Sequence, residues 1–149
     1  MLQDLGVDSL YMATHLTDIM KHRPLVLDGA MGSMIFGLGL TEAEVRSERF
    51  KEWPHDLKNC TDVFGLTHPE KITDLHRQYL EAGADIIETN TFQASLVGLS
   101  DFDFPEDIVR EINFAGVANA RRAADEYTAK TPDQPRFVAG SIGPTSKQT

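Results

Sequence analysis

The sequence is poor in the features that mark disulfide-linked, membrane-spanning or nucleic-acid-binding proteins. Its 149 residues include one cysteine, Cys60, so no disulfide framework can form within the chain. No run approaches the roughly 18 apolar residues that a membrane-spanning helix needs, and the N-terminus lacks the pattern of a secretory signal. Basic residues are scarce: 14 Lys and Arg stand against 23 Asp and Glu, for a formal charge of −9. We therefore expect a soluble cytoplasmic protein with no nucleic acid and no membrane as partner.

The rest of the composition is that of one globular domain, with 41% hydrophobic and 25% charged residues. Residues 9–22 carry apolar side chains near helical spacing, and the Arg23-Pro24 pair that follows is typical of a helix end. We therefore expect a leader helix within residues 1–23 and a domain that occupies residues 24–149.

Three short apolar runs predict the strands of a parallel sheet. They are LVLD (residues 25–28), ADIIETNTF (84–92) and RFVAGSIGP (136–144), and each ends in polar or turn-forming residues. Helical patterns separate the second run from the first and the third from the second. This order predicts an α/β fold in which parallel strands are joined by crossover helices.

The two crossover helices should begin in the same way. Residues 67–70 and 103–106 each offer an N-cap oxygen, from Thr67 or Asp103, then a proline in the first turn and a glutamate at the third position. Gly83 is a suitable end for the first helix. The second helix carries a stripe with small residues in its middle, which would allow close approach to the sheet.

The connection between the first strand and the first crossover helix is unusually long. It spans residues 29–66, which is far more than a simple strand-to-helix loop needs, so we expect it to carry structure or function. Residues 41–44 (TEAE) form a capping-box pattern that predicts a short helix through about Phe50.

The polar residues at the strand ends are the candidate ligand-binding residues, because ligands of parallel α/β folds bind outside the carboxyl ends of the strands. Asp28 and Gly29 follow the first strand, and Asn90 and Thr91 follow the second. Glu88 would share a face with Asn90, and a carboxylate within an apolar run must face a polar cavity or form a structural salt bridge. Carboxylates suit an ammonium group, and the backbone N–H groups of the glycine-rich turn suit a carboxylate. A small zwitterion is therefore the predicted ligand.

Phosphate and metal are weaker alternatives. The turn GAMGSM lacks the lysine and hydroxyl of a P-loop and the spacing of a dinucleotide site, and we expect no helix directly behind it. His55 and Cys60 lie five residues apart with no second pair at ligand spacing, so we expect no metal site within the chain. We expect Cys60 to be an unpaired thiol and His76 to be a half-buried helix residue.

Several long segments resemble one known family at the right mutual spacing. The segments are LVLDGAMGSM, ERFKEWPHDLKNCTDVFGLTHPEKI, YLEAGADIIETNTF, EINFAGVANARRAADEYTAKTP and RFVAGSIGPT. Together they resemble the N-terminal homocysteine-binding domain of the cobalamin-dependent methionine synthases, a homocysteine S-methyltransferase domain, over about residues 25–145. EWPHDLKNCTD and DEYTAKTP are closer to that family than to its betaine- or S-methylmethionine-dependent relatives.

The resemblance implies a fold and a reaction. It implies a TIM (β/α)₈ barrel in which zinc, held by three cysteine thiolates, activates homocysteine for methyl transfer from methylcobalamin, giving methionine. The homocysteine amino and carboxylate groups would be held by Asp28 and the backbone of Gly29, Ala30 and Met31, with Asn90 and Thr91 lining the same mouth. Partners would be the remaining barrel half and the cobalamin- and folate-binding modules.

The resemblance also limits what these residues can do. The family's zinc cysteines follow later strands, Cys60 is not at a matching position, and a barrel takes about 250 residues. We therefore expect the first three or so βα units of the barrel, without metal ligands and inactive alone. A betaine- or S-methylmethionine-type fragment, a non-catalytic amino-acid-binding module and a phosphate-binding protein remain the alternatives.

Overall fold

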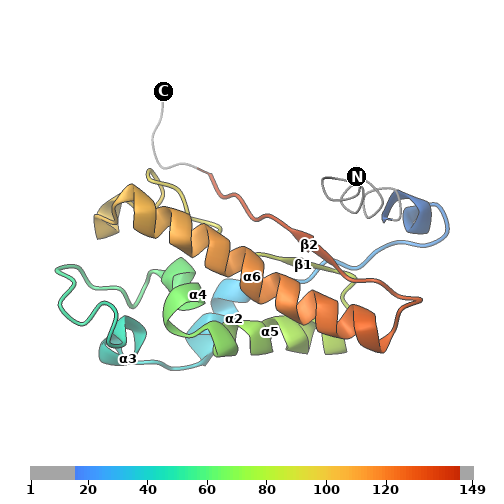
Figure 1. The fold of residues 1–149 in the computed structure, drawn as a ribbon, viewed down its shortest axis with the longest axis horizontal. Helices are drawn as coiled ribbons and strands as arrows, with labels where there is room; N and C mark the ends of the chain where they lie inside the picture. The colour runs from blue at the N-terminus through green and yellow to red at the C-terminus, as the bar shows by residue number, and fades with distance from the viewer. Residues whose placement is uncertain (1–15, 145–149) are drawn as a thin grey trace, which may run out of the picture.

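The computed structural model describes residues 16–144, which form a short parallel sheet with helices packed against it (Figure 1). The predicted leader helix falls largely outside the described residues; residues 16–20 are helical. The elements that follow are α2 (Met31–Gly37), α3 (Glu42–Arg46), η1 (Thr61–Val63), α4 (Phe64–Thr67), α5 (Pro69–Glu81), β1 (Ile86–Glu88), η2 (Ser100–Phe102), α6 (Glu106–Lys130) and β2 (Phe137–Ala139).

The sheet has the predicted parallel arrangement. β1 pairs with β2 in a parallel register that places Ile87 beside Val138, and Leu27 forms an isolated parallel bridge with Ile86. Both strands are shorter than the predicted runs. Ile87 is fully buried, whereas Ile86 and Glu88, on the opposite face of β1, are half-buried. Because α5 and α6 both contact β1, the helices cover the Ile87 face and Glu88 lies on the other.

The predicted first strand is reduced to that single bridge, and Asp28 explains why. The Ile86 N–H donates to the Val26 carbonyl and the Asp28 N–H donates to the Ile86 carbonyl, as in a parallel ladder. The next donor, the Glu88 N–H, bonds instead to the Asp28 carboxylate, at 3.1 Å to each oxygen. A side chain thus replaces the next ladder carbonyl, and the regular pairing stops at the strand end.

The long connection carries several helices, as expected, and one of them corrects the sequence analysis. Helix α2 begins at Met31, directly behind the glycine-rich turn, where no helix was expected. The capping box of Thr41 and Glu44 is confirmed: each side chain bonds to the other's backbone N–H. Helix α3 ends at Arg46 rather than near Phe50, because Ser47 adopts a positive φ of 50° that interrupts the helix.

The predicted N-caps of the two crossover helices are wrong. The N-cap of α5 is His68, because Thr67 belongs to α4 and its hydroxyl donates to a carbonyl of that preceding turn. The N-cap of α6 is Pro105, and Asp103 turns the chain with a left-handed conformation instead. Neither N-cap side chain forms a capping hydrogen bond to the backbone of its helix. Gly83, just beyond α5, has the expected positive φ, of 107°.

Two hydrophobic clusters hold these elements together. One joins the long connection to α5 and α6 through side chains that include Ile35, Leu57, Val63, Phe64, Ile72 and Ile112. The other joins α5, α6 and β1 through Leu80, Ala84, Ile87, Ala120, Ala123 and Ala124. The small residues of α6 do allow close approach, since a Cβ at Gly116 would collide with the Thr91 side chain. No helix among the described residues is long and apolar enough to cross a membrane.

Candidate functional site

A cavity of about 410 Å³ lies at the carboxyl ends of the strands, where the sequence predicts ligand binding. It is bounded by the turn into α2, by the end of β1, and by single residues from η1 and from the segment after β2. The lining residues are Gly29, Ala30, Met31, Gly32, Thr61, Glu88, Thr89, Asn90, Phe92 and Ser141. None of them is a lysine or an arginine, so the lining offers a carboxylate, an amide, hydroxyls and backbone groups.

Glu88 brings a negative charge to this cavity. It is half-buried, and its nearest polar partner is the Ser141 hydroxyl, which donates to Glu88 Oε2 at 3.4 Å. Within residues 16–144 no Lys, Arg or His forms an ion pair with this carboxylate. Because no basic side chain of this region neutralises Glu88, its charge is available to a cationic ligand group.

Asp28 lies directly behind Glu88 rather than among the residues that line the cavity. Burial raises the pKa of the Asp28 carboxyl to about 6, and the negative charge of Glu88 adds to the rise, while the hydrogen bond from the Glu88 N–H opposes it. The two carboxylates therefore interact. A cation placed near Glu88 would also favour the ionised form of Asp28.

Asn90 and Thr91 hold neighbouring segments around the cavity. Asn90 donates from Nδ2 to the Thr61 carbonyl at 2.8 Å, which joins the end of β1 to η1. Thr91 donates from Oγ1 to the Ser141 carbonyl at 2.9 Å and lies 2.6 Å from the Thr89 hydroxyl. Asn90 lines the cavity, whereas Thr91 supports it from behind.

The turn into α2 supplies backbone groups to the cavity. Ala30, Met31 and Gly32 line it, and the N–H groups of a first helical turn have no acceptor within the helix. An added Cβ at Gly29 or Gly32 would meet no protein atom within 4 Å. The space beside these glycines is therefore open.

The family model for homocysteine S-methyltransferases matches residues 25–149. The chain belongs to the homocysteine S-methyltransferase family. Two similar solved structures are the metallated and oxidised forms of the homocysteine methyltransferase MmuM from Escherichia coli, each 27% identical to this chain, with TM-scores of 0.66 and 0.67. The similarity covers 87% of this chain and 41% or 40% of those chains, so this member of the family spans less than half of their length.

The cavity brings together most of the residues that the sequence singled out. Gly29, Ala30, Met31, Glu88 and Asn90 all line it, while Asp28 and Thr91 bond to residues that do. A role for these seven in binding a ligand stays a prediction.

Sequence reasoning missed the other half of the lining. Ser141 could have been found, because it ends the third apolar run as Asn90 ends the second. Phe92 could have been found too, because it ends the second run two residues after Asn90. Thr61 could not, since only the fold of the long connection carries it to the cavity.

The zinc implied by the resemblance does not fit the described residues of this family member. Within residues 16–144, no three His, Cys, Asp or Glu side chains gather as metal ligands. Cys60 is free and fully buried, and burial raises the pKa of its thiol to about 12. His55 pairs with Asp103 at 3.0 Å rather than with Cys60. We therefore assign no metal chemistry to these residues.

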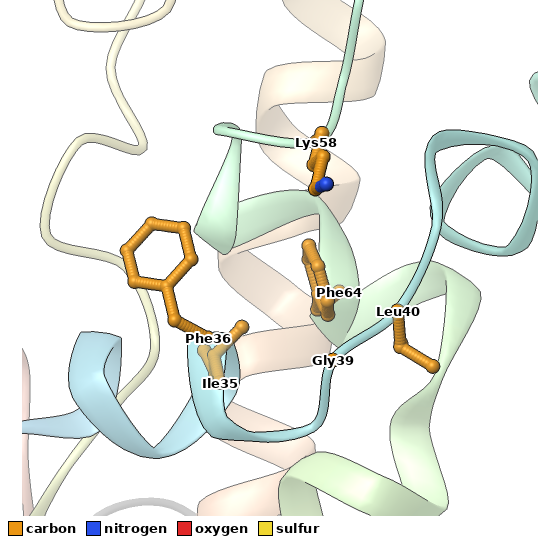
Figure 2. A pocket seen from close by; sticks show the side chains of 6 residues that line it. All are labelled: Ile35, Phe36, Gly39, Leu40, Lys58 and Phe64. Atoms are coloured by element: carbon orange, nitrogen blue, oxygen red, sulfur yellow. The ribbon is translucent and has the colours of Figure 1, made fainter.

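A second cavity, of about 160 Å³, differs in character (Figure 2). It is lined by Ile35, Phe36, Gly39, Leu40, Phe64 and Lys58, so its wall is apolar apart from one ammonium group. It has no carboxylate to bind an amino group. The cavity at the strand ends is therefore the candidate site for a zwitterion.

Proposed function

We propose that this chain forms the homocysteine-binding part of a homocysteine S-methyltransferase. The observation that supports this most is that Glu88, with no ion-pair partner among residues 16–144, and the first turn of α2 line the same cavity. An α-amino acid carries an ammonium group and a carboxylate side by side. The acidic side chain suits the first, and the backbone N–H groups of the turn at residues 29–32 suit the second.

We assign roles in this binding as follows. Glu88 would accept hydrogen bonds from the ammonium group, with Asp28 adding negative charge behind it. The backbone of Gly29, Ala30 and Met31 would face the carboxylate. Asn90, supported by Thr91, would fix the remaining wall, where the side chain of homocysteine would lie.

The complete reaction is a wider proposal. We infer a (β/α)₈ barrel of which residues 25–144 form the first strands and helices, and methyl transfer to the homocysteine sulfur as its reaction. Methylcobalamin is the donor we favour, on the resemblance to cobalamin-dependent methionine synthases; betaine or S-methylmethionine is the alternative. The described residues bind and orient the amino acid but lack a thiolate set, so we expect the isolated chain to bind homocysteine without methylating it.

Calorimetric titration of the purified chain with L-homocysteine tests the binding role. We expect binding that does not depend on added zinc and that weakens about tenfold in E88Q, because a charge-assisted hydrogen bond contributes roughly 1.4 kcal/mol more than the amide replacement. G32A should fold, since the space beside Gly32 is open, yet we expect it to bind less well because the added methyl stands on a residue that lines the cavity.

The matched control is E111Q, which removes a half-exposed carboxylate on α6 that pairs with Arg49 far from the cavity lining. It should leave the affinity unchanged. Equal affinities for wild type, E88Q and G32A would contradict the assigned site. Tight binding of nucleotides or inorganic phosphate would instead support the phosphate alternative.

A non-catalytic amino-acid-binding module is the second candidate function. The observation that favours it is a polar cavity at the strand ends in a region, residues 16–144, where no thiolate cluster is found. Specificity distinguishes the two functions. A methyltransferase part should prefer homocysteine to homoserine and methionine, whereas a general amino-acid binder should accept all three with similar affinity.

A further inference from the structure

The most deeply buried acidic side chain near the cavity is Asp62, to which the proposed function gives no role. It is 0% exposed, and within residues 16–144 it forms no ion pair. Burial raises the pKa of its carboxyl above the ordinary value. A buried carboxylate without a cation costs stability. The hydrogen bonds that Asp62 accepts are therefore the reason to expect a role for it.

Asp62 holds the turn that follows β1. Its Oδ1 accepts a hydrogen bond from the Gln93 backbone N–H at 2.9 Å, across 31 residues of sequence. Next to it, the Thr61 carbonyl accepts the 2.8 Å bond from Asn90. Two adjacent residues of η1, Thr61 and Asp62, therefore form hydrogen bonds to the chain on both sides of Phe92.

The segment between these two hydrogen bonds, residues 90–93, forms one wall of the cavity. Asn90 and Phe92 line it, and so does Thr61 itself. Phe92 is 56% exposed, so its own packing does little to fix its position. The bonds to residues 61 and 62, together with the 2.8 Å bond from the Gly143 N–H to the Phe92 carbonyl, set where this wall stands.

We propose that Asp62 is a positioning residue that fixes the Asn90–Phe92 wall of the cavity for its amino-acid ligand. As far as it concerns homocysteine, this rests on the proposed function. Asp62 does not line the cavity, and it acts through the Gln93 backbone.

The test compares D62A with D62N. The asparagine oxygen can still accept the Gln93 N–H, so D62N should keep both the wall and the affinity. D62A leaves that N–H without its acceptor, and the turn should open locally. We expect hydrogen exchange at the Gln93 amide to rise at least tenfold beyond any change in global stability, and the dissociation constant for homocysteine to rise about tenfold. In D62N, the exchange rate at the Gln93 amide and the dissociation constant for homocysteine should each stay within threefold of wild type.

T73A is the matched control. Like Asp62, Thr73 is buried and bonds to a backbone group, in this case by donating to the Pro69 carbonyl, but it lies on α5, away from the cavity lining. It should lower thermal stability without changing the Gln93 exchange rate or the affinity. If D62A does not fold, D62S, whose side chain is too short to reach Gln93, replaces it in the same comparison.

The outcomes separate this proposal from the proposed function. If wild type binds no homocysteine, the proposed function is wrong. In that case, rapid local exchange at the Gln93 amide in D62A but not in D62N would still support the positioning role. Exchange that follows global stability in D62A would overturn the role. So would binding of homocysteine with equal affinity by wild type and D62A.

Discussion

At the residue scale, His76 is the clearest departure from the sequence analysis. A half-buried position was predicted, but the imidazole is 0% exposed, and neither ring nitrogen has a hydrogen-bond partner among the described residues. Amphipathic spacing identifies the buried face of a helix such as α5. It does not show how deep a polar residue on that face will lie, because depth depends on the elements that cover it.

Burial lowers the pKa of His76 to about 4, against an ordinary value near 6.5. Between these values the unfolded chain binds a proton that the folded chain does not, so stability falls as the pH drops through this range. H76L removes this dependence. We expect its stability relative to wild type to increase by roughly 3 kcal/mol between pH 7 and pH 4, measured by urea denaturation. A constant difference would show that folding does not lower the pKa of His76.

Asp28 acts in the opposite direction over nearly the same range. Its pKa is raised to about 6 in the folded protein, so the folded chain binds the extra proton and loses stability as the pH rises through 4 to 6. D28N should therefore stabilise the protein at pH 7 more than at pH 4, by about 1 kcal/mol after allowance for partial exposure. The same variant should weaken homocysteine binding; stabilisation with unchanged affinity would assign Asp28 a purely structural role.

At the scale of elements, one end of the sheet forms the ligand cavity and the other end stabilises the fold. The carboxyl end carries the cavity. At the other end, Asp85 is 1% exposed and accepts hydrogen bonds from Arg23 at 2.6 and 2.8 Å, from the Val26 N–H at 3.0 Å and from Gln134 at 3.2 Å. This carboxylate ties the segment before Leu27 and the segment before β2 to the start of β1.

We expect D85A to lower the melting temperature by at least about 5 °C, because it removes four hydrogen bonds from a buried site. The Arg23 guanidinium lowers the pKa of Asp85, so the wild-type advantage over D85A should shrink as the pH falls below 4. Homocysteine affinity at 20 °C should not change, since Asp85 lies at the opposite end of the strands. A loss of affinity in folded D85A would contradict the separation of a binding end and a stabilising end of the strands.

At the scale of the whole molecule, the sequence predicts the order of elements better than their ends. Apolar runs and helix periodicity correctly predicted two parallel strands and both crossover helices, because these patterns follow directly from burial. The ends depend on single side chains: Asp28 stops the pairing of Leu27, Ser47 stops α3, and Thr67 joins α4 instead of capping α5. Thr61 was missed from the cavity lining for a related reason, since only tertiary packing carries it to the end of β1.

The helices leave part of the molecule's apolar surface exposed. On α6, Phe114 is 63% and Val117 46% exposed, on the same side of the helix, and within the described residues β2 pairs only with β1. Exposed apolar residues and an unpaired strand edge both favour association between chains. We therefore expect the isolated chain to self-associate at micromolar concentration, as analytical ultracentrifugation would show.

The double variant F114E/V117K should weaken this association by about tenfold, because it places charges on the exposed side of α6, and the carboxylate that replaces the Phe114 ring can pair with Arg110 one turn away. Arg110 already lies 5.4 Å from the Phe114 ring, so the geometry allows this ion pair.

F36E is the matched control: Phe36 is 57% exposed but lies on α2, beside the second cavity (Figure 2). Dissociation by F36E and not by the α6 variant would move the associating surface to α2. Homocysteine affinity should be the same in all three proteins, since none of these side chains lines the cavity at the strand ends.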